Sequence, residues 1–441
     1  MPEAAPFCGM GVCFQCCDAE RVRTCLPRAA DAPTANQETD VLIVGAGPAG
    51  IAAAHAAAGR GFPTLMVDEN AGPGGQIWRG EKRRLPDTAR LLTLTTIAGF
   101  PTANALLAER AGHPFLIHYR RLILATGARE RWLPFPGWTL PHVTGAGGLQ
   151  ALVKGGLDIA GQRVIVAGTG PLLLAVASYL RTRGAAIAAI VEQAPAARVN
   201  RFAATLALSP ARLAQAALLR ARLLGVPYLT GAWIEETNQS QTTIDHRGRK
   251  LRIPADRVAT GFGLVPNVEL ARLLGCAVEA NAVAVDSNQR TSVANVWCAG
   301  EAAGIGGVDA AAIEGRIAGF AAAGHLEAVR ELHPHRDRAH RFARRLEETF
   351  RLRQELLAVP TPETVVCRCE NVPLGRIREH DSWREAKLMT RCGMGPCQGR
   401  VCGPAVEALL GWRDASARPP VLPVSVAALA ANTNTTEDPA R

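Results

Sequence analysis

The stretch Asp40-Val-Leu-Ile-Val-Gly-Ala-Gly-Pro-Ala-Gly50 decides the fold of this chain. Its branched apolar run predicts a buried strand, and the glycines that follow predict a tight turn into an alanine-rich helix. In such a Gly-x-Gly-x-x-Gly turn, Gly45 permits the turn, Gly47 lets the backbone approach a pyrophosphate, and Gly50 lets the helix pack on the strand. Phosphate charge then meets the unpaired N–H groups at the helix start. The stretch therefore predicts a dinucleotide-binding βαβ unit.

The second strand of this unit places an acid beside the turn. The run Thr64-Leu-Met-Val67 ends at Asp68 and Glu69, where a carboxylate is expected to accept hydrogen bonds from a ribose. Asp68 is the first choice on spacing, and Glu69 is the alternative.

The same rhythm of strand, glycine turn and helix returns later in the chain. Gly168-Thr-Gly-Pro-Leu-Leu173 follows a strand, and the next strand ends at Glu192. Gly168 and Gly170 are two of the three expected glycines, but Leu173 occupies the third place. Glu192 favours an unphosphorylated ribose over a 2′-phosphate. This second turn is a candidate nucleotide site, and the residues leave open whether it holds NADH, ATP or nothing.

Length and composition set limits on the class of protein. With 441 residues, 48% of them hydrophobic and 20% charged, the chain suffices for about three folding units and is not disordered as a whole. The net charge of +10 is spread along the chain, and no basic stretch interleaved with aromatics predicts nucleic acid binding. The start lacks the pattern of a signal peptide. The apolar stretch 164–180 is better explained as a strand, turn and helix than as a transmembrane segment. We expect a cytoplasmic protein, in solution or peripheral at the inner face of the membrane.

The twelve cysteines fall mainly into two clusters near the two ends of the chain. In a reducing compartment such clusters favour metal or redox chemistry over structural disulfides. The front cluster, Cys8, Cys13, Cys16 and Cys25, has the spacing C-x4-C-x2-C-x8-C, which matches the start of the plant-type [2Fe-2S] pattern. A zinc site with four thiolates is the alternative. Only seven residues precede Cys8, so we expect a partial ferredoxin-like segment at residues 1–36.

The rear cluster lies in Val366-Cys-Arg-Cys-Glu370 and in Arg391-Cys-Gly-Met-Gly-Pro-Cys-Gln-Gly-Arg-Val-Cys402. It resembles the bacterioferritin-associated-ferredoxin-like [2Fe-2S] domain, a small helical unit with a Cys-x-Cys pair first and a glycine-rich two-cysteine turn later. That resemblance implies Cys392 as an extra cysteine, and it implies these metal ligands: Cys367, Cys369, Cys397 and Cys402.

Three further motifs resemble the two-dinucleotide-binding flavoprotein family, which includes disulfide reductases and many NADH-linked reductases. They are Gly74-Gly-Gln76 after the acidic strand end, Ala125-Thr-Gly127 after an apolar strand, and Ala299-Gly-Glu301 after Val-Trp-Cys. The resemblance implies that the chain binds FAD, and that Glu301 reaches the ribityl chain where Asp is commoner. The residues that it assigns to FAD are Gly45, Gly47, Pro48, Ala49, Gly50, Asp68, Glu69, Gly75, Gln76, Ala125, Thr126, Gly127, Gly300 and Glu301. The residues assigned to the second nucleotide are Gly168, Gly170 and Glu192.

The same resemblance excludes one branch of the family. A disulfide reductase needs a cysteine pair beside the flavin, but residues 74–79 and 131–150 contain no cysteine. Electrons must therefore leave the flavin by another route.

The order of these parts resembles the larger electron-transfer subunits of opine oxidases, hydrogen cyanide synthase and multimeric proline or hydroxyproline dehydrogenases. The phrases at 127–131, 136–138, 145–150 and 304–309 fit that group. The resemblance implies an FAD-dependent oxidoreductase subunit that passes on electrons from the C–N bond of an opine, a D-amino acid or (hydroxy)proline. The partners it implies are a substrate-oxidising flavoprotein subunit, in some members a small ferredoxin-like subunit, and a downstream electron acceptor. No catalytic acid or base is expected in this chain.

Two other functions remain as alternatives. One is a self-contained NADH-dependent flavoprotein reductase that uses the second glycine turn. The other is a non-catalytic scaffold subunit with structural nucleotides.

We therefore predict an α/β fold with two Rossmann-like dinucleotide-binding domains in tandem and a small helical iron-sulfur domain. The FAD-binding domain is expected at 37–139 and 290–326, with a NAD-type domain inserted at 140–289. A helical connector is expected at 327–358, the bacterioferritin-associated-ferredoxin-like domain at 359–412, and a tail with a docking strand at 413–441.

Overall fold

The computed structural model describes residues 31, 33, 35–413 and 417–433. The chain divides into two compact units, each assembled from segments that are far apart in the sequence. One unit comprises Leu26–Arg129, Val265–Ala343 and Ala415–Arg441, and we call it the Gly45 unit. The other comprises Met1–Cys25, Glu130–Leu264 and Arg344–Asp414, and we call it the Gly168 unit.

A seven-stranded sheet organises the Gly45 unit, with the strand order β3-β2-β1-β6-β5-β4 and β19 paired to β6. β1, β2, β3, β6 and β19 are parallel, and β4 and β5 extend the sheet in antiparallel fashion. The strands are β1 (Gln37–Val44), β2 (Thr64–Val67), β3 (Ala89–Leu92), β4 (Thr95–Thr102), β5 (Ala105–Arg110), β6 (His113–Leu124), β17 (Val278–Glu279), β18 (Ala282–Val283) and β19 (Val296–Cys298). The helices are α1 (Pro48–Ala58), α6 (Glu269–Leu273), η2 (Gly300–Ala302), α7 (Gly307–Ala322) and α13 (Val426–Thr433).

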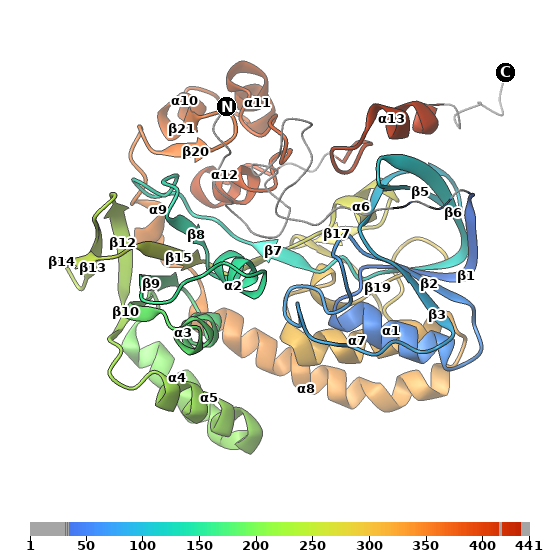
Figure 1. The fold of residues 1–441 in the computed structure, drawn as a ribbon, viewed down its shortest axis with the longest axis horizontal. Coiled ribbons are helices and arrows are strands. Elements are labelled where there is room, and N and C mark those ends of the chain that lie inside the picture. The colour runs from blue at the N-terminus through green and yellow to red at the C-terminus, as the bar shows by residue number, and fades with distance from the viewer. Residues whose placement is uncertain (1–30, 32, 34, 414–416, 434–441) are drawn as a thin grey trace. The chain divides into compact units, whose positions relative to one another are not determined.

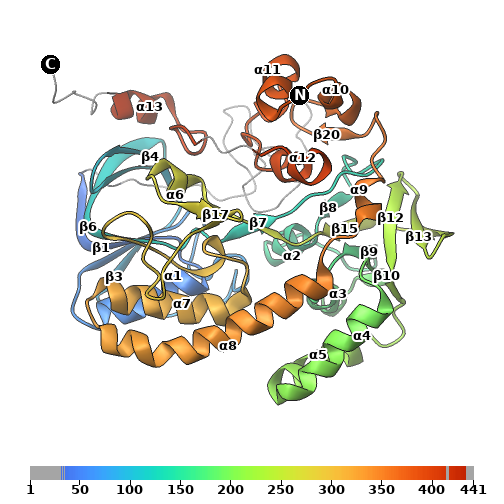
Figure 2. The same ribbon diagram turned by 180° about the vertical axis from the view of Figure 1, so that it is seen from behind.

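Alternate residues of β1 enter two different cores. Leu42 and Val44 pack with α6 on one face of the sheet, whereas Val41 and Ile43 pack with α1 and α7 on the other. A parallel strand that is buried on both faces must be apolar throughout, which explains the unbroken run before Gly45. Figures 1 and 2 show α1 and α7 side by side against the sheet, with the first part of α8 (Leu326–Phe350) beyond α7.

The register of the sheet brings the sequence motifs to one edge. The last residues of β1, β2, β6 and β19 pair with one another. The residues that come next in the sequence, Gly45, Asp68, Ala125 and Ala299, therefore lie together at the carboxyl ends of these strands. Ligands of open α/β sheets bind at this edge.

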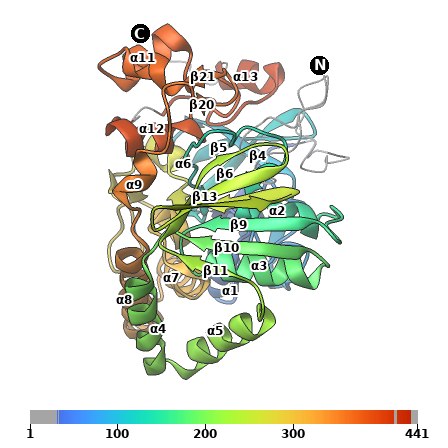
Figure 3. The same ribbon diagram turned by 90° about the vertical axis from the view of Figure 1, so that its left-hand side faces the viewer.

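The Gly168 unit repeats the plan with a five-stranded parallel sheet in the order β11-β10-β9-β15-β8 and an antiparallel sheet in the order β12-β13-β14. Figure 3 shows β9, β10 and β11 stacked in order with α3 beside them. The strands are β8 (Val143–Gly145), β9 (Arg163–Gly168), β10 (Ala186–Glu192), β11 (Tyr228–Thr230), β12 (Ala232–Thr237), β13 (Gln241–His246), β14 (Arg249–Pro254) and β15 (Arg257–Gly261). The helices are α2 (Ala146–Lys154), α3 (Leu172–Thr182), α4 (Ala196–Thr205), η1 (Leu206–Leu208) and α5 (Pro210–Arg222). Two further strands, β7 (Ala128–Glu130) and β16 (Leu264–Pro266), pair with each other.

The rear cysteines belong to a small helical region of the Gly168 unit. Its elements are α9 (Gln354–Leu357), β20 (Val365–Cys367), β21 (Val372–Pro373), α10 (Leu374–Arg378), α11 (Trp383–Thr390) and α12 (Cys402–Leu410). Trp383, Leu374 and Val406 share one small core with the cysteines. The indole N–H of Trp138 donates to the carbonyl oxygen of Val365 at 2.5 Å, which ties this region to the turn before β8 in the same unit.

The predicted fold class is confirmed, because two Rossmann-like sheets and a C-terminal helical region with a cysteine cluster are present. The predicted connector contains the helix α8, which continues through Pro334. The boundaries of the predicted domains stay a prediction. Over the described residues, we find no helix that is both long and apolar enough to cross a bilayer.

The predicted docking strand of the tail is wrong for residues 417–433, which contain the helix α13 instead. Alanine and leucine favour a helix there, and the hydroxyl of Ser425 accepts a hydrogen bond from the N–H of Ala428 at the helix start. The tail does contact the sheet, since Val421 N donates to Ala98 O at 3.0 Å.

Candidate functional site

The first glycine turn uses each of its glycines for a different reason. Gly45 has φ +106°, and a Cβ there would overlap the carbonyl oxygen of Ala125. A Cβ on Gly50 would overlap the carbonyl oxygen of Gly45, so the missing side chain allows α1 to pack on β1. Gly47 is the N-cap of α1 and offers no side chain to its N–H groups. The first turn of α1 is therefore a bare helix start at the carboxyl edge of the sheet.

Two other glycine motifs, Gly74-Gly-Gln76 and Ala299-Gly-Glu301, lie against the start of α1. Gly74 N donates to Ala46 O at 2.7 Å, and a Cβ on Gly75 would lie 3.0 Å from Cα of Gly47. A Cβ on Gly300 would lie 2.7 Å from the Cβ of Ala49. Three backbone segments without side chains thus surround the start of α1. This cradle fits the pyrophosphate of a dinucleotide, which needs close approach of backbone N–H groups.

One polar atom beside the cradle has no partner. The side-chain oxygen Oε1 of Gln76 is buried and accepts no hydrogen bond from the described residues. A buried acceptor of this kind is costly unless a ligand or water supplies a donor. Gln76, which follows Gly75 in the sequence, thus has a buried acceptor without a partner, and its role in binding FAD stays a prediction.

Asp68 and Glu69 have different surroundings. Asp68 is 8% exposed, and its Oδ2 accepts from Ala46 N at 2.5 Å while its Oδ1 accepts from Asn70 N at 2.7 Å. Burial raises the pKa of Asp68, and these hydrogen bonds oppose the shift. One oxygen of Asp68 holds the glycine turn and the other holds the backbone after β2, whereas Glu69 is partly exposed.

The predicted Ala125-Thr-Gly127 segment is fastened by Asn267, which the sequence did not single out. Thr126 donates its hydroxyl hydrogen to Asn267 O at 2.7 Å, and Asn267 Nδ2 donates to Thr126 O at 2.9 Å. Arg129 in turn donates to Asn267 Oδ1 at 2.8 Å and pairs with Glu269 at 2.9 Å. Asn267 follows Pro266, an ordinary turn signal, so no pattern in the sequence marks it.

The predicted Ala299-Gly-Glu301 motif is held by a hydrogen bond to another residue that the sequence did not single out. Glu314 of α7 is 4% exposed; its Oε2 accepts from Gly300 N at 2.8 Å, and its Oε1 lies 2.6 Å from His340 Nε2 on α8. The predicted Glu301 lies beside Gly300, and burial raises its pKa while a hydrogen bond from Gly307 N opposes the shift. A lone acid in an alanine-rich helix gives no spacing signal, so only the fold identifies Glu314.

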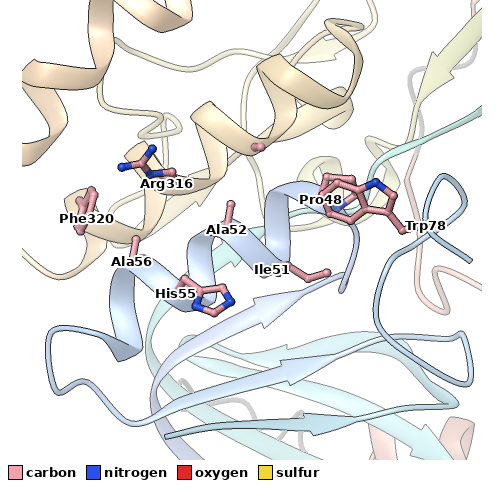
Figure 4. A pocket seen from close by; sticks show the side chains of 9 residues that line it. Pro48, Ile51, Ala52, His55, Ala56, Trp78, Arg316 and Phe320 are labelled. Carbon is pink, nitrogen blue, oxygen red and sulfur yellow. The ribbon is translucent and has the colours of Figure 1, made fainter. Parts of the chain in front are cut away.

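A cavity of about 330 Å³ runs along the outer faces of α1 and α7. It begins at Pro48, the first residue of α1, and Trp78 closes one end (Figure 4). The guanidinium of Arg83 lies over the Trp78 ring, 3.9 Å from its centroid. Apolar side chains dominate the lining, so the cavity is distinct in character from the glycine cradle.

The second glycine turn has the same backbone plan but a different acid geometry. Gly168 has φ +140°, and a Cβ there would overlap the carbonyl oxygen of Gly261. Glu192 is fully buried; its Oε2 accepts from Gly170 N at 2.7 Å and its Oε1 from Ala194 N at 2.8 Å. Burial raises the pKa of Glu192 to about 7. One oxygen of Glu192 thus holds the glycine turn and the other holds the backbone two residues after it, and its predicted role toward a ribose stays a prediction.

The chain itself covers this second turn. Thr169 donates its hydroxyl hydrogen to Phe350 O at 3.0 Å, and a Cβ on Gly170 would meet the Phe350 ring at 3.8 Å. The amide of Gln193 donates to Thr169 Oγ1, Phe350 O and Arg351 O at 2.9, 3.3 and 3.2 Å. The end of α8 thus lies where a nucleotide would approach the turn. The arrangement does not fit a nucleotide at Gly168 and Gly170.

Leu173, at the place of the third glycine, packs into a hydrophobic core of the Gly168 unit. Leu173 is buried, and a Cβ on Gly261 would lie 3.8 Å from its side chain. The Leu173 side chain, which is larger than the expected glycine, is therefore packed between α3 and the sheet.

Two phrases that the sequence singled out separately meet at Glu130. This residue is 5% exposed, and its carboxylate accepts from Gly147 N at 2.7 Å and from Gly148 N at 3.1 Å at the start of α2. A Cβ on Gly145 would overlap this carboxylate. Burial raises the pKa of Glu130 to about 7, and the backbone hydrogen bonds oppose the shift. The glycines of the 145–150 phrase therefore make room for a buried acid.

The five rear cysteines come together in the helical region. The Sγ atoms of Cys367, Cys392 and Cys402 all lie within 4.8 Å of one another. Cys369 and Cys397 form a second group, with their Sγ atoms 3.6 Å apart. Cys392 thus lies within 4.8 Å of two predicted ligands, Cys367 and Cys402.

The thiols of this group are unpaired and shielded from water, which fits a soft metal or an iron-sulfur cluster. All five are free of disulfides, and all but Cys369 are at most 1% exposed. Hydrogen bonds with neighbouring thiols, that with Cys369 first, lower the pKa of Cys367. The N–H of Gly393 also points at the Cys367 sulfur, at 3.4 Å. Thiolate ligands stabilised by backbone N–H groups are the chemistry that iron-sulfur clusters require. The front cysteines, Cys8, Cys13, Cys16 and Cys25, lie outside the described residues.

Comparison with known proteins places these features in a family. The sequence profile described as "Pyridine nucleotide-disulphide oxidoreductase" matches residues 39–320. The chain is similar to the A subunit of opine oxidase from Agrobacterium tumefaciens (strain Ach5), with 31% identity over 89% of this chain and 91% of that one. It is also similar to the hydrogen cyanide synthase subunit HcnB of Pseudomonas aeruginosa, with 31% identity over 82% of this chain and 90% of that one.

A solved structure agrees with the fold. The L-proline dehydrogenase from P. horikoshii superposes with a TM-score of 0.64 over 90% of this chain and 81% of that one. Its sequence identity is 18%, so the likeness concerns the fold alone.

Proposed function

The chain belongs to the pyridine nucleotide-disulphide oxidoreductase family, within the group of the opine oxidase A subunits, and is an FAD-dependent oxidoreductase. From this premise we propose that it is the electron-transfer subunit of a multi-subunit dehydrogenase or oxidase, with FAD in the Gly45 unit and a [2Fe-2S] cluster on the rear cysteines. The complex acts on the C–N bond of an opine, a D-amino acid or (hydroxy)proline.

The observation that carries this proposal is the combination in one chain of a dinucleotide cradle and five clustered thiols, four of them buried. The cradle consists of Gly47, Gly75 and Gly300 around the bare start of α1. We assign the adenosine ribose to Glu69, because both oxygens of Asp68 are engaged by the backbone. Gln76 supplies a buried acceptor to the bound group.

The cofactor pair explains why no disulfide-forming pair is needed beside the cradle. A flavin accepts two electrons as a hydride while a [2Fe-2S] cluster takes one electron at a time, so the pair converts two-electron chemistry into single-electron transfer. This chain's residues hold the two groups and shield them from water. Substrate oxidation is assigned to a partner flavoprotein, and electrons leave to a downstream acceptor.

The covered second turn argues against the self-contained NADH-dependent reductase. That function needs a nucleotide at Gly168 and Gly170, where Phe350 lies against the turn. The five rear thiols, four of them buried, argue against a scaffold with structural nucleotides alone, because free thiols gathered from two separate stretches of sequence serve no evident packing purpose.

The partners and the site of action follow from the same reasoning. Relatives of this length are named as subunits, so the partners that we propose are a flavoprotein that oxidises the substrate and a small ferredoxin-like protein. Free thiols persist in a reducing compartment, so we place the complex in the cytoplasm, in solution or at the inner face of the membrane.

The test is an absorption and EPR spectrum of the anaerobically purified chain, with the acid-released nucleotide identified and the iron and zinc measured. We expect FAD and a reducible [2Fe-2S] signal. The purified chain alone should not oxidise an opine, a D-amino acid or proline, whereas the complex with its partner should. A colourless protein, or one with zinc in place of iron, would refute the proposal.

A further inference from the structure

The rear cluster contains one cysteine more than a [2Fe-2S] cluster needs, and its five thiols form a pair and a trio that adjoin through Cys369 and Cys367. Cys369 and Cys397 are the pair, 3.6 Å apart. Cys367, Cys392 and Cys402 are the trio, each within 4.8 Å of the other two. Such a cluster has two irons with two cysteine ligands each, so the trio offers three thiols for two positions.

Thiol spacing separates the roles of the two groups. Two sulfurs on one tetrahedral metal with bonds of about 2.3 Å lie roughly 3.8 Å apart. The Cys369–Cys397 distance of 3.6 Å already matches this spacing, so this pair suits one metal position. The three thiols of the trio stand close enough for Cys367 to share the second metal with either neighbour.

Local backbone structure holds Cys392 in the trio. α11 ends at Thr390 and is capped by Arg391, which has φ +66° and whose N–H donates to Lys387 O at 3.0 Å. Gly393 follows with φ +79°, and a Cβ there would lie 2.8 Å from the Trp383 ring. Cys392 itself is fully buried. The chain on either side is therefore fixed, and the thiol is directed to the other sulfurs by the end of the helix.

Cys402 reaches the same place from a different element. It is the first residue of α12 and is 1% exposed. Cys392 and Cys402 thus approach Cys367 from the end of one helix and the start of another. The Sγ atoms of Cys392 and Cys402 both lie within 4.8 Å of Cys367 Sγ, so both thiols are near it at the same time.

We propose that Cys392 and Cys402 are alternative ligands for one iron of the rear cluster. One iron is held by Cys369 and Cys397, and the other by Cys367 together with either Cys402 or Cys392. Exchange breaks one Fe–S bond and forms another; the incoming thiol loses its proton and the outgoing thiolate takes one up, with no change in oxidation state. This inference rests on the proposed [2Fe-2S] cluster.

The experiment uses the full chain, purified without air, and compares C392A, C402A, the double variant C392A/C402A and C369A. C276A is the control, because Cys276 is a buried free cysteine outside the rear cluster. Iron, acid-labile sulfide and the EPR spectrum after reduction are measured for each, and C369A defines the signal that remains when the rear cluster is lost. Circular dichroism of each variant checks that the helical region is folded.

We expect C392A and C402A each to keep iron near the wild-type level, with EPR g-values in C402A shifted from those of the wild type. The double variant should fall to the level of C369A. Loss of the cluster in C402A alone would mean that Cys392 only fills space, and loss in C392A alone would make Cys392 an obligatory ligand; either result overturns the proposal. Retention in the double variant would overturn it as well. A wild-type chain without iron would instead refute the proposed function itself.

Discussion

The hydroxyl of Thr169 donates a hydrogen bond to the carbonyl oxygen of Phe350 at 3.0 Å. This contact joins the second glycine turn to the end of α8, nearly two hundred residues later, at the place where a nucleotide would approach. We therefore predict that NADH does not reduce the bound flavin within a turnover time. Stopped-flow absorbance after mixing with NADH measures this, and rapid bleaching of the flavin would show that the covered turn opens.

Gln193 is the residue that holds this cover in place, with four hydrogen bonds to Thr169, Phe350, Arg351 and Arg353. Replacing it by alanine leaves partly buried backbone groups without this partner, and we expect Q193A to lower the free energy of unfolding by about 1–3 kcal/mol. Urea unfolding monitored by fluorescence checks the value. The control Q215A changes an exposed glutamine on α5 and should have little effect. Equal stability of both variants would contradict the role of Gln193.

Glu130 makes stability depend on pH. Its pKa is raised from 4.5 to about 7 by burial, so between these values the folded chain keeps a proton that the unfolded chain loses. The contribution to stability is complete below about pH 4.5 and decreases as the pH rises to about 7, by about 3 kcal/mol in total. E130Q cannot titrate, so its profile should lack this decrease.

The measurement for Glu130 is the urea midpoint at several pH values between 5 and about 8. The exposed Glu327 provides the control E327Q, which should follow the wild type across the range. Because glutamine offers an N–H₂ group to the backbone donors of α2, E130Q starts from a lower stability at every pH. The test is therefore the change of the urea midpoint with pH, and not the absolute stability of each variant.

Gly300 tests the cradle directly. G300A places a Cβ 2.7 Å from the Cβ of Ala49 at φ +75°, and we expect most of the bound FAD to be lost on purification. The control G61A has φ +82° with no atom within 4 Å, so it shares the backbone strain of about 1 kcal/mol but not the overlap. FAD content per chain measures both. The double variant G300A/A49G should recover part of the FAD, and equal losses in G300A and G61A would count against the cradle.

Glu314 should support FAD binding without touching it. E314A leaves the N–H of Gly300 without its acceptor, which costs about 1–3 kcal/mol and corresponds to a roughly five- to hundredfold weaker FAD affinity. H340A keeps the bond between Glu314 and Gly300 and should weaken FAD less. Titration of the apoprotein with FAD, followed by quenching of flavin fluorescence, gives the three dissociation constants. If H340A weakened FAD binding more than E314A does, Glu314 would not be the residue that supports the cradle.

The sequence predicted the first glycine turn, because the Gly-x-Gly-x-x-Gly spacing and the apolar run before it are local signals. The segments that these glycines let approach, at Ala125 and Gly75, come from later in the chain. That the cradle residues bind FAD stays a prediction. Residues that act across the fold were missed. Asn267, Glu314 and Glu130 each contact a motif through a hydrogen bond to backbone, and backbone groups leave no trace in spacing or residue type.

The sequence alone determined three features: the glycine turns, the alternation of strands and helices, and the spacing of the rear cysteines. Each of them depends on neighbours a few residues away. Tertiary structure decided which turn is open, because the last residue of α8, Phe350, reaches Gly170 only in the folded Gly168 unit. It also decided that Cys392 lies within 4.8 Å of Cys367 and Cys402, because distances among these thiols exist only in the folded chain.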